Sequence, residues 1–229
     1  MSKAIRNIYS LKAERPNKVS LVILAAGVPL RMTSFCSRLL VDVEGKTVFN
    51  RYVSALSKVT SDYEIVVVGG YAAPSLYESL PSDIIFVRNK DYQTTNNATS
   101  LYLGMMAATT KNLLVMYDNV IINENLFSGV DFKESFVISE TTSCKKEGIG
   151  LTKEKDYLEN MSYDMKEKWG GIAYFSGKEY LQLRKNCETI EDRTLAFELI
   201  NKSLASGGRF KVHARTKQIK NFSSKKDLE

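Results

Sequence analysis

The stretch VSLVILAAG, residues 19–27, decides the fold class. Its first eight residues, from Val19 to Ala26, form a near-continuous apolar run, which is typical of a strand buried on both faces of a parallel sheet. The run ends in small residues and a glycine. Such residues let backbone N–H groups approach a phosphate or a base edge without obstruction by a Cβ atom. The stretch therefore predicts a buried strand that leads directly into a ligand site.

Outward from this strand, strands and helices alternate through the first half of the chain. Strands are expected at residues 64–68, 84–87 and 113–117, and helices at 47–56, 73–80 and 100–108. This rhythm predicts an α/β fold with a Rossmann-like, doubly wound and mostly parallel sheet. The second half is less regular, with strands expected at 136–139, 148–152 and 172–175 and helices at 178–185 and 191–206.

The chain shows neither an internal repeat nor a low-complexity linker, so we expect a single domain over residues 1–229. Within it, residues 1–18 are read as an N-terminal extension and residues 202–229 as a basic C-terminal segment. The hydrophobic fraction of 44% and the charged fraction of 25% are typical of a soluble globular protein. No apolar run approaches the roughly 20 residues that span a bilayer. Residues 1–16 do not resemble a signal peptide.

The cysteines and the histidine restrict the chemistry. Cys36, Cys144 and Cys187 are far apart and odd in number, which favours reduced thiols in a cytoplasmic protein. His213 is the single histidine. Ser-His and Cys-His catalytic pairs could use no other residue, and His-rich metal sites are excluded. We therefore expect a reaction that proceeds without imidazole.

The net charge of +6 is concentrated near the C-terminus. Eight Lys or Arg residues and no Asp or Glu lie between Lys202 and Lys226. Such a segment could contact nucleic acid, a membrane surface or a phosphorylated substrate. A solvated segment, or a linker to another part of a protein, is the simpler interpretation. Nucleic acid is an unlikely partner because no basic groove motif rich in aromatic residues is present.

Small or polar residues follow every expected strand of the first half. They are Ala25-Ala26-Gly27 with Arg31, Gly69-Gly70-Tyr71, Asn89 leading to Thr95-Asn96-Asn97, and Tyr117-Asp118-Asn119. In an open parallel sheet the ligand lies beyond the carboxyl ends of the strands, so these groups are expected to meet. Arg31 offers a fork of donors to a triphosphate, and Asp118 is suited to Mg²⁺. Alternatively, Gly27 merely closes a strand and Asp118 is a turn residue or a helix cap.

Several of these groups resemble the motifs of a known family. LAAGVPLRM, residues 24–32, resembles the opening motif L-A-A-G-x-G-x-R-M/L of the sugar-phosphate and choline-phosphate nucleotidyltransferases. SRLL at 37–40 and EGKTV at 44–48 look like that family's Pro-Lys-x-Leu segment and G-K-x-x turn. Residues 89–101 are similar to a stretch of the choline-phosphate cytidylyltransferase branch. Asp118 falls at the position of the family's metal-binding aspartate, and GGIAYFS at 170–176 resembles its late G-x-Y-x-F strand.

The resemblance implies a Mg²⁺-dependent nucleotidyl transfer. The phosphate of an acceptor would attack the α-phosphate of a nucleoside triphosphate, and pyrophosphate would leave. A phosphate monoester is already charged at neutral pH and needs no general base. Positioning and charge neutralisation then supply the catalysis. The segment with Asn96 and Asn97 favours CTP as the nucleotide. The acceptor stays open among phosphocholine-like compounds, phosphonates, amino-acid phosphates and sugar phosphates.

The resemblance also assigns roles to residues. Arg31 would hold the triphosphate, Arg38 would replace the family's catalytic lysine, and Asp118 would hold Mg²⁺. The residues expected to line the base, the ribose and the phosphates are Leu24, Ala25, Ala26, Gly27, Gly70, Asn96, Asn97 and Ser100.

Three positions depart from the family pattern. Pro29 replaces a motif glycine and has no N–H to donate. Arg38 keeps the charge of the lysine but is wider. The family's second metal-binding aspartate falls at Ser223, where Asn221 or Asp227 could substitute. Two hypotheses follow: an active but divergent enzyme, or a relative that binds a nucleotide or a phosphorylated ligand without transfer. An unrelated Rossmann-like protein, or a module that binds nucleic acid through its basic tail, also stays open.

Trp169 has two interpretations. Its indole could hold a choline-like cation by a cation–π interaction, or it could be a packing residue.

Overall fold

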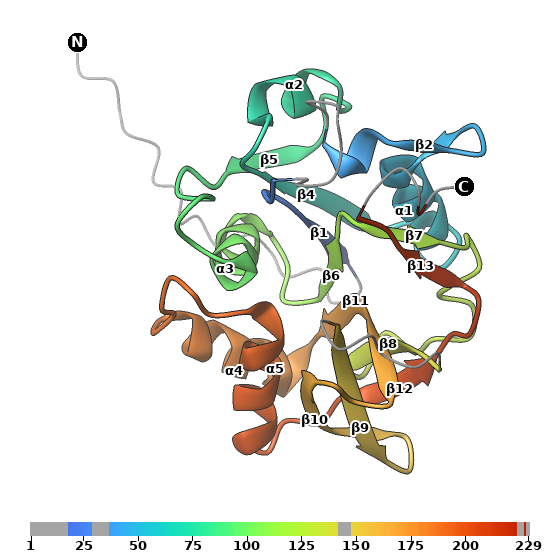
Figure 1. Cartoon of the computed structure of the whole chain (residues 1–229), viewed down its shortest axis with the longest axis vertical. Coiled ribbons are helices and arrows are strands. Elements are labelled where there is room, and N and C mark those ends of the chain that lie inside the picture. Colours follow the sequence, from blue (N-terminus) through green and yellow to red (C-terminus); the bar gives the residue numbers. More distant parts are fainter. Residues whose placement is uncertain (1–17, 29–36, 142–147, 224–226, 228–229) are drawn as a thin grey trace.

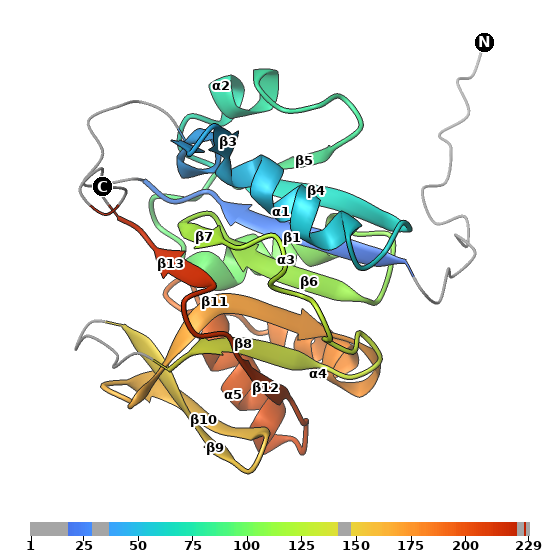
Figure 2. The ribbon, with the colours of Figure 1, turned by 90° about the vertical axis from the view of Figure 1, so that its right-hand side faces the viewer.

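A nine-stranded sheet forms the centre of the computed structural model, which describes residues 18–28, 37–141, 148–223 and 227. The strands lie in the order β5-β4-β1-β6-β11-β8-β12-β10-β9, and Figure 2 shows most of them stacked in this sequence. Their bounds are β1 Val19–Ala25, β4 Tyr63–Gly69, β5 Ile85–Arg88, β6 Leu113–Tyr117, β8 Phe136–Glu140, β9 Ile149–Glu154, β10 Tyr157–Tyr163, β11 Glu167–Phe175 and β12 Lys211–Ala214.

The first half of the sheet is parallel, as the sequence predicts. β1 lies between β4 and β6, and Val22 pairs with Val66 on one side and with Val115 on the other. All seven residues of β1 are buried. Because successive side chains of a strand point to opposite faces, Val22 contributes to one hydrophobic core and Ile23 to the other. The carboxyl ends of these strands meet at one edge, which is where a ligand site is expected.

The second half of the sheet is mainly antiparallel. β11 runs antiparallel to both β6 and β8, and β10 runs antiparallel to β9 and β12. β9 and β10 are joined by a tight turn in which Lys155 has a φ of 55°, and a turn this short can only join antiparallel neighbours. The Rossmann-like α/β fold is confirmed, and its mostly parallel character holds for the half up to β6.

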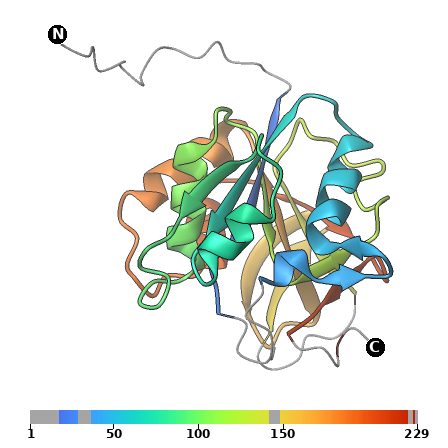
Figure 3. The same cartoon turned by 90° about the horizontal axis from the view of Figure 1, so that it is seen from above.

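Helices cover both faces of the sheet (Figures 1 and 3). α3 (Asn97–Ala107), α4 (Gly177–Cys187) and α5 (Ala196–Ala205) pack on one face, while α1 (Val48–Ser57) and α2 (Ala73–Glu78) pack on the other. α3 approaches the sheet closely at Gly104, where an added Cβ atom would lie 2.4 Å from Cγ1 of Val22. This close packing places the N-terminus of α3 over the carboxyl ends of the parallel strands.

Most predicted helices agree with the structure, and two begin elsewhere. The Thr47 hydroxyl caps α1 by accepting a hydrogen bond of 3.2 Å from the N–H of Asn50. α3 begins at Asn97, three residues before the predicted start. The helix predicted from Glu191 begins only at Ala196, because residues 191–194 form a turn in which the N–H of Thr194 donates to the carbonyl of Glu191. The acidic residues at 191 and 192 therefore precede the helix and do not begin it.

The basic C-terminal segment is part of the fold. β12 lies inside the sheet between β8 and β10, and β13 (Ile219–Asn221) pairs with β7 (Val120–Ile122). Phe222 is fully buried after β13. Lys211 pairs with Glu134, and the Arg215 guanidinium donates to backbone carbonyls. The linker interpretation is therefore wrong for residues 202–223, because Phe210, Val212, Ile219 and Phe222 are buried in the core.

Besides β7, β10, β12 and β13, three short elements were not predicted from the sequence. A single 3-10 turn, η1 (Arg38–Leu40), precedes a small hairpin of β2 (Asp42–Val43) and β3 (Lys46–Thr47).

Within the described part of the chain, no helix is both long enough and apolar enough to cross a bilayer.

Candidate functional site

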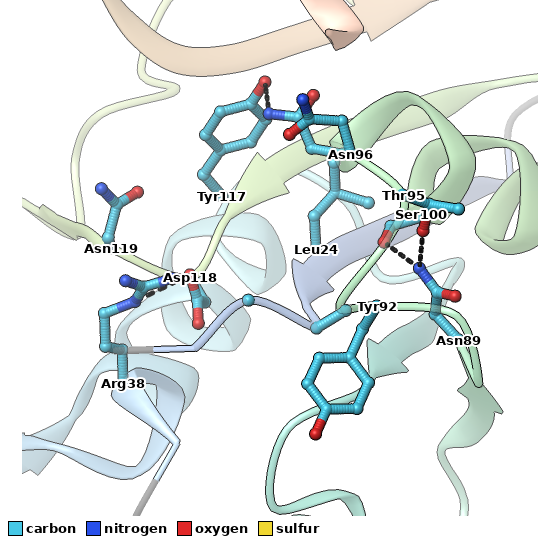
Figure 4. A pocket seen from close by; sticks show the side chains of 13 residues that line it. Leu24, Arg38, Asn89, Tyr92, Thr95, Asn96, Ser100, Tyr117, Asp118 and Asn119 are labelled. Carbon is cyan, nitrogen blue, oxygen red and sulfur yellow. Dashed lines mark hydrogen bonds and ion pairs between the residues drawn. The ribbon is translucent and has the colours of Figure 1, made fainter. Parts of the chain in front are cut away.

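A pocket of about 250 Å³ opens at the carboxyl ends of β1, β5 and β6 (Figure 4). The N-terminus of α3 and the loop that precedes it contribute its other wall. The pocket thus lies at the edge of the sheet predicted from the strand-end residues. It is lined by Leu24, Ala26, Gly27, Arg38, Asn89, Tyr92, Thr95, Asn96, Asn97, Ser100, Tyr117, Asp118 and Asn119.

Asp118 and Arg38 form an ion pair inside the pocket. Nη2 of Arg38 lies 2.9 Å and Nε 3.1 Å from Oδ1 of Asp118. Only 5% of the Asp118 side chain and 17% of the Arg38 side chain are exposed. Burial raises the pKa of the Asp118 carboxyl, and the adjacent Arg38 guanidinium opposes that shift. The pair therefore keeps a nearly enclosed carboxylate beside a fixed cation.

Tyr52 of α1 is hydrogen-bonded to the turn that carries Asp118. The Tyr52 hydroxyl lies 2.7 Å from the carbonyl oxygen of Tyr117 and 2.6 Å from that of Val120, so it can donate to either. It also accepts a hydrogen bond of 3.3 Å from the N–H of Val120. Full burial, and secondarily the charge of Asp118, raise the pKa of this phenol well above its ordinary value. Tyr52 thus stays a neutral hydroxyl that ties together both ends of the turn.

A buried amide organises the wall beneath α3. Nδ2 of Asn89 donates to the hydroxyls of Thr95 and Ser100, both at 3.2 Å, while Oδ1 accepts from the N–H of Asp91 at 3.0 Å (Figure 4). Asn89 is 2% exposed. Because its amide hydrogens already go to the two hydroxyl oxygens, the hydroxyl of Ser100 is left to act as a donor. The loop and the first turn of α3 are thereby fixed relative to each other.

Asn96 and Asn97 connect the pocket to the segment before α5. The N–H of Asn96 donates to the carbonyl of Asp192, and Nδ2 of Asn96 donates to that of Arg193. Nδ2 of Asn97 donates to the Tyr117 hydroxyl at 2.8 Å, and Oδ1 accepts from the N–H of Ala196 at 2.7 Å. Both side chains line the pocket while holding α3, β6 and α5 together.

The structure brings eight of the eleven predicted site residues to the pocket. They are Leu24, Ala26, Gly27, Arg38, Asn96, Asn97, Ser100 and Asp118. Ala25 does not line it, because alternation along β1 turns its methyl group into the opposite core. Gly70 lies behind the wall, where an added Cβ atom would be 2.7 Å from the carbonyl oxygen of Ala26. Arg31, like Pro29, lies outside the described residues.

The sequence reasoning missed Asn89, Tyr92, Thr95, Tyr117 and Asn119 as site residues, and Tyr52 as their support. Four of the missed lining residues belong to the polar groups after β5 and β6 that the strand-end rule had already marked. A prediction that included every polar residue of those groups would have contained these four residues. Tyr52 carries no such signal, because in the sequence it is one apolar position of an amphipathic helix.

Trp169 is a packing residue in this structure. It is 6% exposed and does not line the pocket. Its indole Nε1 donates to the carbonyl of Ile172 at 3.0 Å, across a bulge of β11 in which Gly171 has a φ of 73°. The ring meets that of Tyr117 edge to face, with 5.2 Å between the centroids. Trp169 thus supports the pocket wall from behind.

The C-terminal strand passes beside the turn that carries Asp118. The N–H of Phe222 donates to the carbonyl of Asn119, and Asn221 pairs with Val120. Ser223 donates to the Asp227 carboxylate through both its N–H and its hydroxyl, at 2.8 and 3.1 Å. None of Asn221, Ser223 and Asp227 lines the pocket. In this structure the pocket therefore has Asp118 as its one acidic lining residue among those described.

A comparison with family models shows what the first half of the chain is similar to. Residues 21–130 match the model of the MobA-like NTP transferase domain. The matched segment makes up just under half of the chain. The prediction of a nucleotidyltransferase-type domain is thereby confirmed, and the matched segment runs from β1 past the Asp118 turn, so it contains every residue that lines the pocket.

Solved structures of nucleotidyltransferases share the fold over nearly the whole chain. CTP:phosphocholine cytidylyltransferase from Streptococcus pneumoniae superposes with a TM-score of 0.75 at 20% identity, covering 91% of this chain and 95% of that one. The inositol-1-phosphate CTP transferase from T. maritima gives 0.71 at 15% identity, with coverages of 92% and 91%. A nucleoside-diphosphate-sugar pyrophosphorylase from Vibrio cholerae RC9 gives 0.69 at 12% identity, with coverages of 90% and 97%.

A curated relative matches by sequence over a shorter stretch. The bifunctional protein GlmU of Neisseria meningitidis is 26% identical over 107 residues, which are 47% of this chain and 23% of that protein. The match thus spans less than a quarter of the relative's length.

Proposed function

We propose that this chain transfers a nucleotidyl group, with CMP favoured, from a nucleoside triphosphate to a small acceptor that bears a phosphate or phosphonate. The observation that carries the proposal is the pocket at the strand ends. It is lined by the buried carboxylate of Asp118, the guanidinium of Arg38, the small residues Ala26 and Gly27, and asparagine side chains. The family match of residues 21–130 supports the same class of reaction.

The proposed chemistry needs few groups from the protein. An oxygen of the acceptor phosphate attacks the α-phosphorus, the bond from that phosphorus to the oxygen bridging to the β-phosphate breaks, and pyrophosphate leaves. Because the attacking phosphate is already ionised, no general base is required. The chain's residues orient the two phosphates in line and neutralise charge. Arg38 is proposed to contact the reacting phosphates, and Gly27 leaves the space beside the backbone in which the Arg38 guanidinium lies.

A magnesium ion is part of the proposal, and the residues present fit one that arrives with the nucleotide. Mg²⁺ usually binds through one or two carboxylates plus substrate phosphates. Asp118 offers one buried carboxylate, of which Arg38 contacts only Oδ1. The described residues contain no group of three or more His, Cys, Asp or Glu side chains that could hold a metal ion alone. When bound, the ion would neutralise charge on the triphosphate.

CTP is favoured over the other nucleotides on three grounds. The segment with Asn96 and Asn97 resembles the cytidylyltransferase branch, and two of the structures that share this fold are named for CTP. The wall beneath α3 offers the Ser100 hydroxyl as a donor, which suits the acceptor atoms O2 and N3 of cytosine. The acceptor molecule is proposed only as a class, a small compound that carries a phosphate or phosphonate.

The test measures pyrophosphate release for all four nucleoside triphosphates against phosphocholine, sugar 1-phosphates and a phosphonate. Turnover should be fastest with CTP and should require Mg²⁺. Asp118→Asn should lower it by roughly 10²- to 10³-fold, as expected for the loss of one electrostatic group in an enclosed site. Asp83→Asn, which changes an exposed carboxylate far from the pocket, is the matched control and should leave the rate unchanged.

A second candidate function is a relative that binds a nucleotide or a phosphorylated ligand without transferring it. The observation that favours it is the pairing of Arg38 with Asp118, together with a serine at position 223 whose hydroxyl is engaged by Asp227. Thermal stabilisation by a nucleotide, without pyrophosphate release on the whole panel, would replace the transferase proposal with this one.

A further inference from the structure

The pocket contains a cation of its own. Of the described residues that line it, Arg38 is the one basic side chain and Asp118 the one acidic side chain, and they pair with each other. A buried carboxylate is costly unless a cation or hydrogen-bond donors compensate it. In the ligand-free chain, that compensation comes from the guanidinium of Arg38.

The position of Arg38 is fixed by its surroundings. Its neighbour Leu39 is fully buried, and the Ser37 hydroxyl accepts a hydrogen bond of 3.3 Å from the N–H of Leu39. The guanidinium also lies close to Gly27, because a Cβ atom added there would be 3.3 Å from Nη2 of Arg38. The guanidinium is therefore seated between the end of β1 and Asp118, where the missing side chain at Gly27 leaves space for it.

The geometry of the Arg38–Asp118 pair affects the binding of a divalent cation to Asp118. Both Nε and Nη2 of Arg38 point to Oδ1, so a divalent ion reaching the other oxygen of Asp118 would share one carboxylate with a guanidinium. Like charges brought this close in a desolvated site repel strongly. A polyphosphate removes the conflict, because its oxygens can accept from the guanidinium and bind the ion at the same time.

From this we infer that Arg38 holds the cation position at Asp118 in the ligand-free chain, so that a divalent ion binds there only together with a polyphosphate. The inference rests on the proposed function, since it takes the ligand of the pocket to be a nucleoside triphosphate. It assigns to Arg38 the control of the order in which metal and nucleotide bind, in addition to its proposed contact with the reacting phosphates.

The experiment uses Mn²⁺ as the probe and follows its binding to the full chain by water proton relaxation. Wild type without nucleotide should bind Mn²⁺ weakly, and Arg38→Gln should bind it at least about tenfold more tightly, because a neighbouring positive charge is removed. Asp118→Asn in the Arg38→Gln background should abolish the gain. Lys46→Gln, which removes a lysine paired with Glu124 outside the pocket, is the matched control and should behave as wild type.

A second measurement needs no variant. A non-hydrolysable CTP analogue should raise the Mn²⁺ affinity of wild type by about tenfold or more, after correction for Mn²⁺ bound by the free analogue. Equal Mn²⁺ affinity of wild type with and without the analogue overturns the inference, as does an Arg38→Gln chain that folds and binds Mn²⁺ no better than wild type. Both results would leave pyrophosphate release untouched. Absence of release on the whole panel, with the Mn²⁺ results as expected, would instead count against the transferase alone.

Discussion

The side-chain amide of Asn97 donates a hydrogen bond of 2.8 Å to the hydroxyl of Tyr117. The oxygen of the same amide accepts from the N–H of Ala196 at the start of α5. One side chain at the N-terminus of α3 thus joins the last residue of β6 to the first residue of a helix from the other half of the chain. The wall of the pocket and the packing of α3 against α5 depend on the same group.

Replacing Asn97 by alanine should destabilise the chain by about 1–3 kcal/mol, because the hydroxyl of Tyr117 and the N–H of Ala196 lose their partner. Urea unfolding would measure the loss. Asn97→Asp keeps an acceptor for Ala196 and should cost less. Asn96→Ala loses a hydrogen bond at an exposed position and is the matched control. Equal losses for Asn96→Ala and Asn97→Ala would argue against a special role of Asn97.

Tyr52→Phe should also destabilise the chain, by about 1–3 kcal/mol, because the N–H of Val120 and the carbonyl of Tyr117 would lose a buried partner. The variant should bind nucleotide more weakly as well, since the turn that carries Asp118 is no longer held from α1. Calorimetric unfolding and nucleotide titration would report the two effects. Tyr77→Phe is the control, because 61% of Tyr77 is exposed, and its stability should match that of wild type.

Glu64 should make the stability depend on pH at the acidic end. Burial raises its pKa, but hydrogen bonds from Lys18, Ser20 and Thr109 outweigh burial, so that the pKa lies below the ordinary 4.5. A carboxyl whose pKa is lower in the folded than in the unfolded chain stabilises the fold above the unfolded pKa, and this contribution is lost as the pH falls through the folded pKa. Stability should therefore fall below pH 4.5.

The matched variant for this effect is Glu64→Gln. It should be less stable than wild type at neutral pH, and the difference should shrink as the pH is lowered below 4.5. Glu159→Gln alters an exposed carboxylate and should show no such dependence. A difference between Glu64→Gln and wild type that stays constant down to the acid transition would contradict the assigned pKa shift.

Cys187 should react slowly with thiol reagents. Burial raises the pKa of its thiol to about 12, and only the thiolate is a nucleophile, so near pH 8 its reaction should be about a thousandfold slower than that of a free cysteine. The measurement needs a chain in which Cys36 and Cys144 are serine. Unfolding that chain in urea should restore the ordinary rate, and a fast reaction of the folded chain would show that Cys187 is accessible.

The strand ends were predictable because a buried strand and the ligand edge that follows it have different residue types, and these lie next to each other in the sequence. An apolar run such as Val19–Ala25 indicates a central strand, and the small or polar residues that follow it indicate the ligand edge. Asp118 and the two asparagines could be placed at the pocket by this rule, whereas Ser100 was assigned only through the family resemblance. The rule states which end of a strand a residue occupies, but it does not state what its side chain contacts.

The remaining features depend on contacts between distant parts of the chain. The Arg38–Asp118 pair joins positions 80 residues apart, and the Asn97–Ala196 contact joins positions 99 apart. The pairing of β12 inside the sheet was missed because Lys211 and His213 look like residues of a solvated segment. In the structure, Lys211 pairs with Glu134, and the ring of His213 packs against that of Phe136. Local patterns carry no information on such partners.

β11 covers an edge of β6 that a shorter fragment would expose. It is hydrogen-bonded to β6, yet it lies outside the segment 21–130 that carries the family match and the whole pocket. A fragment limited to that segment would present β6, with its apolar side chains and unpaired backbone groups, as a free edge. Such an edge is a template for the strand of another molecule. A fragment that keeps this edge of β6 paired must therefore include the distant strand from Glu167 to Phe175.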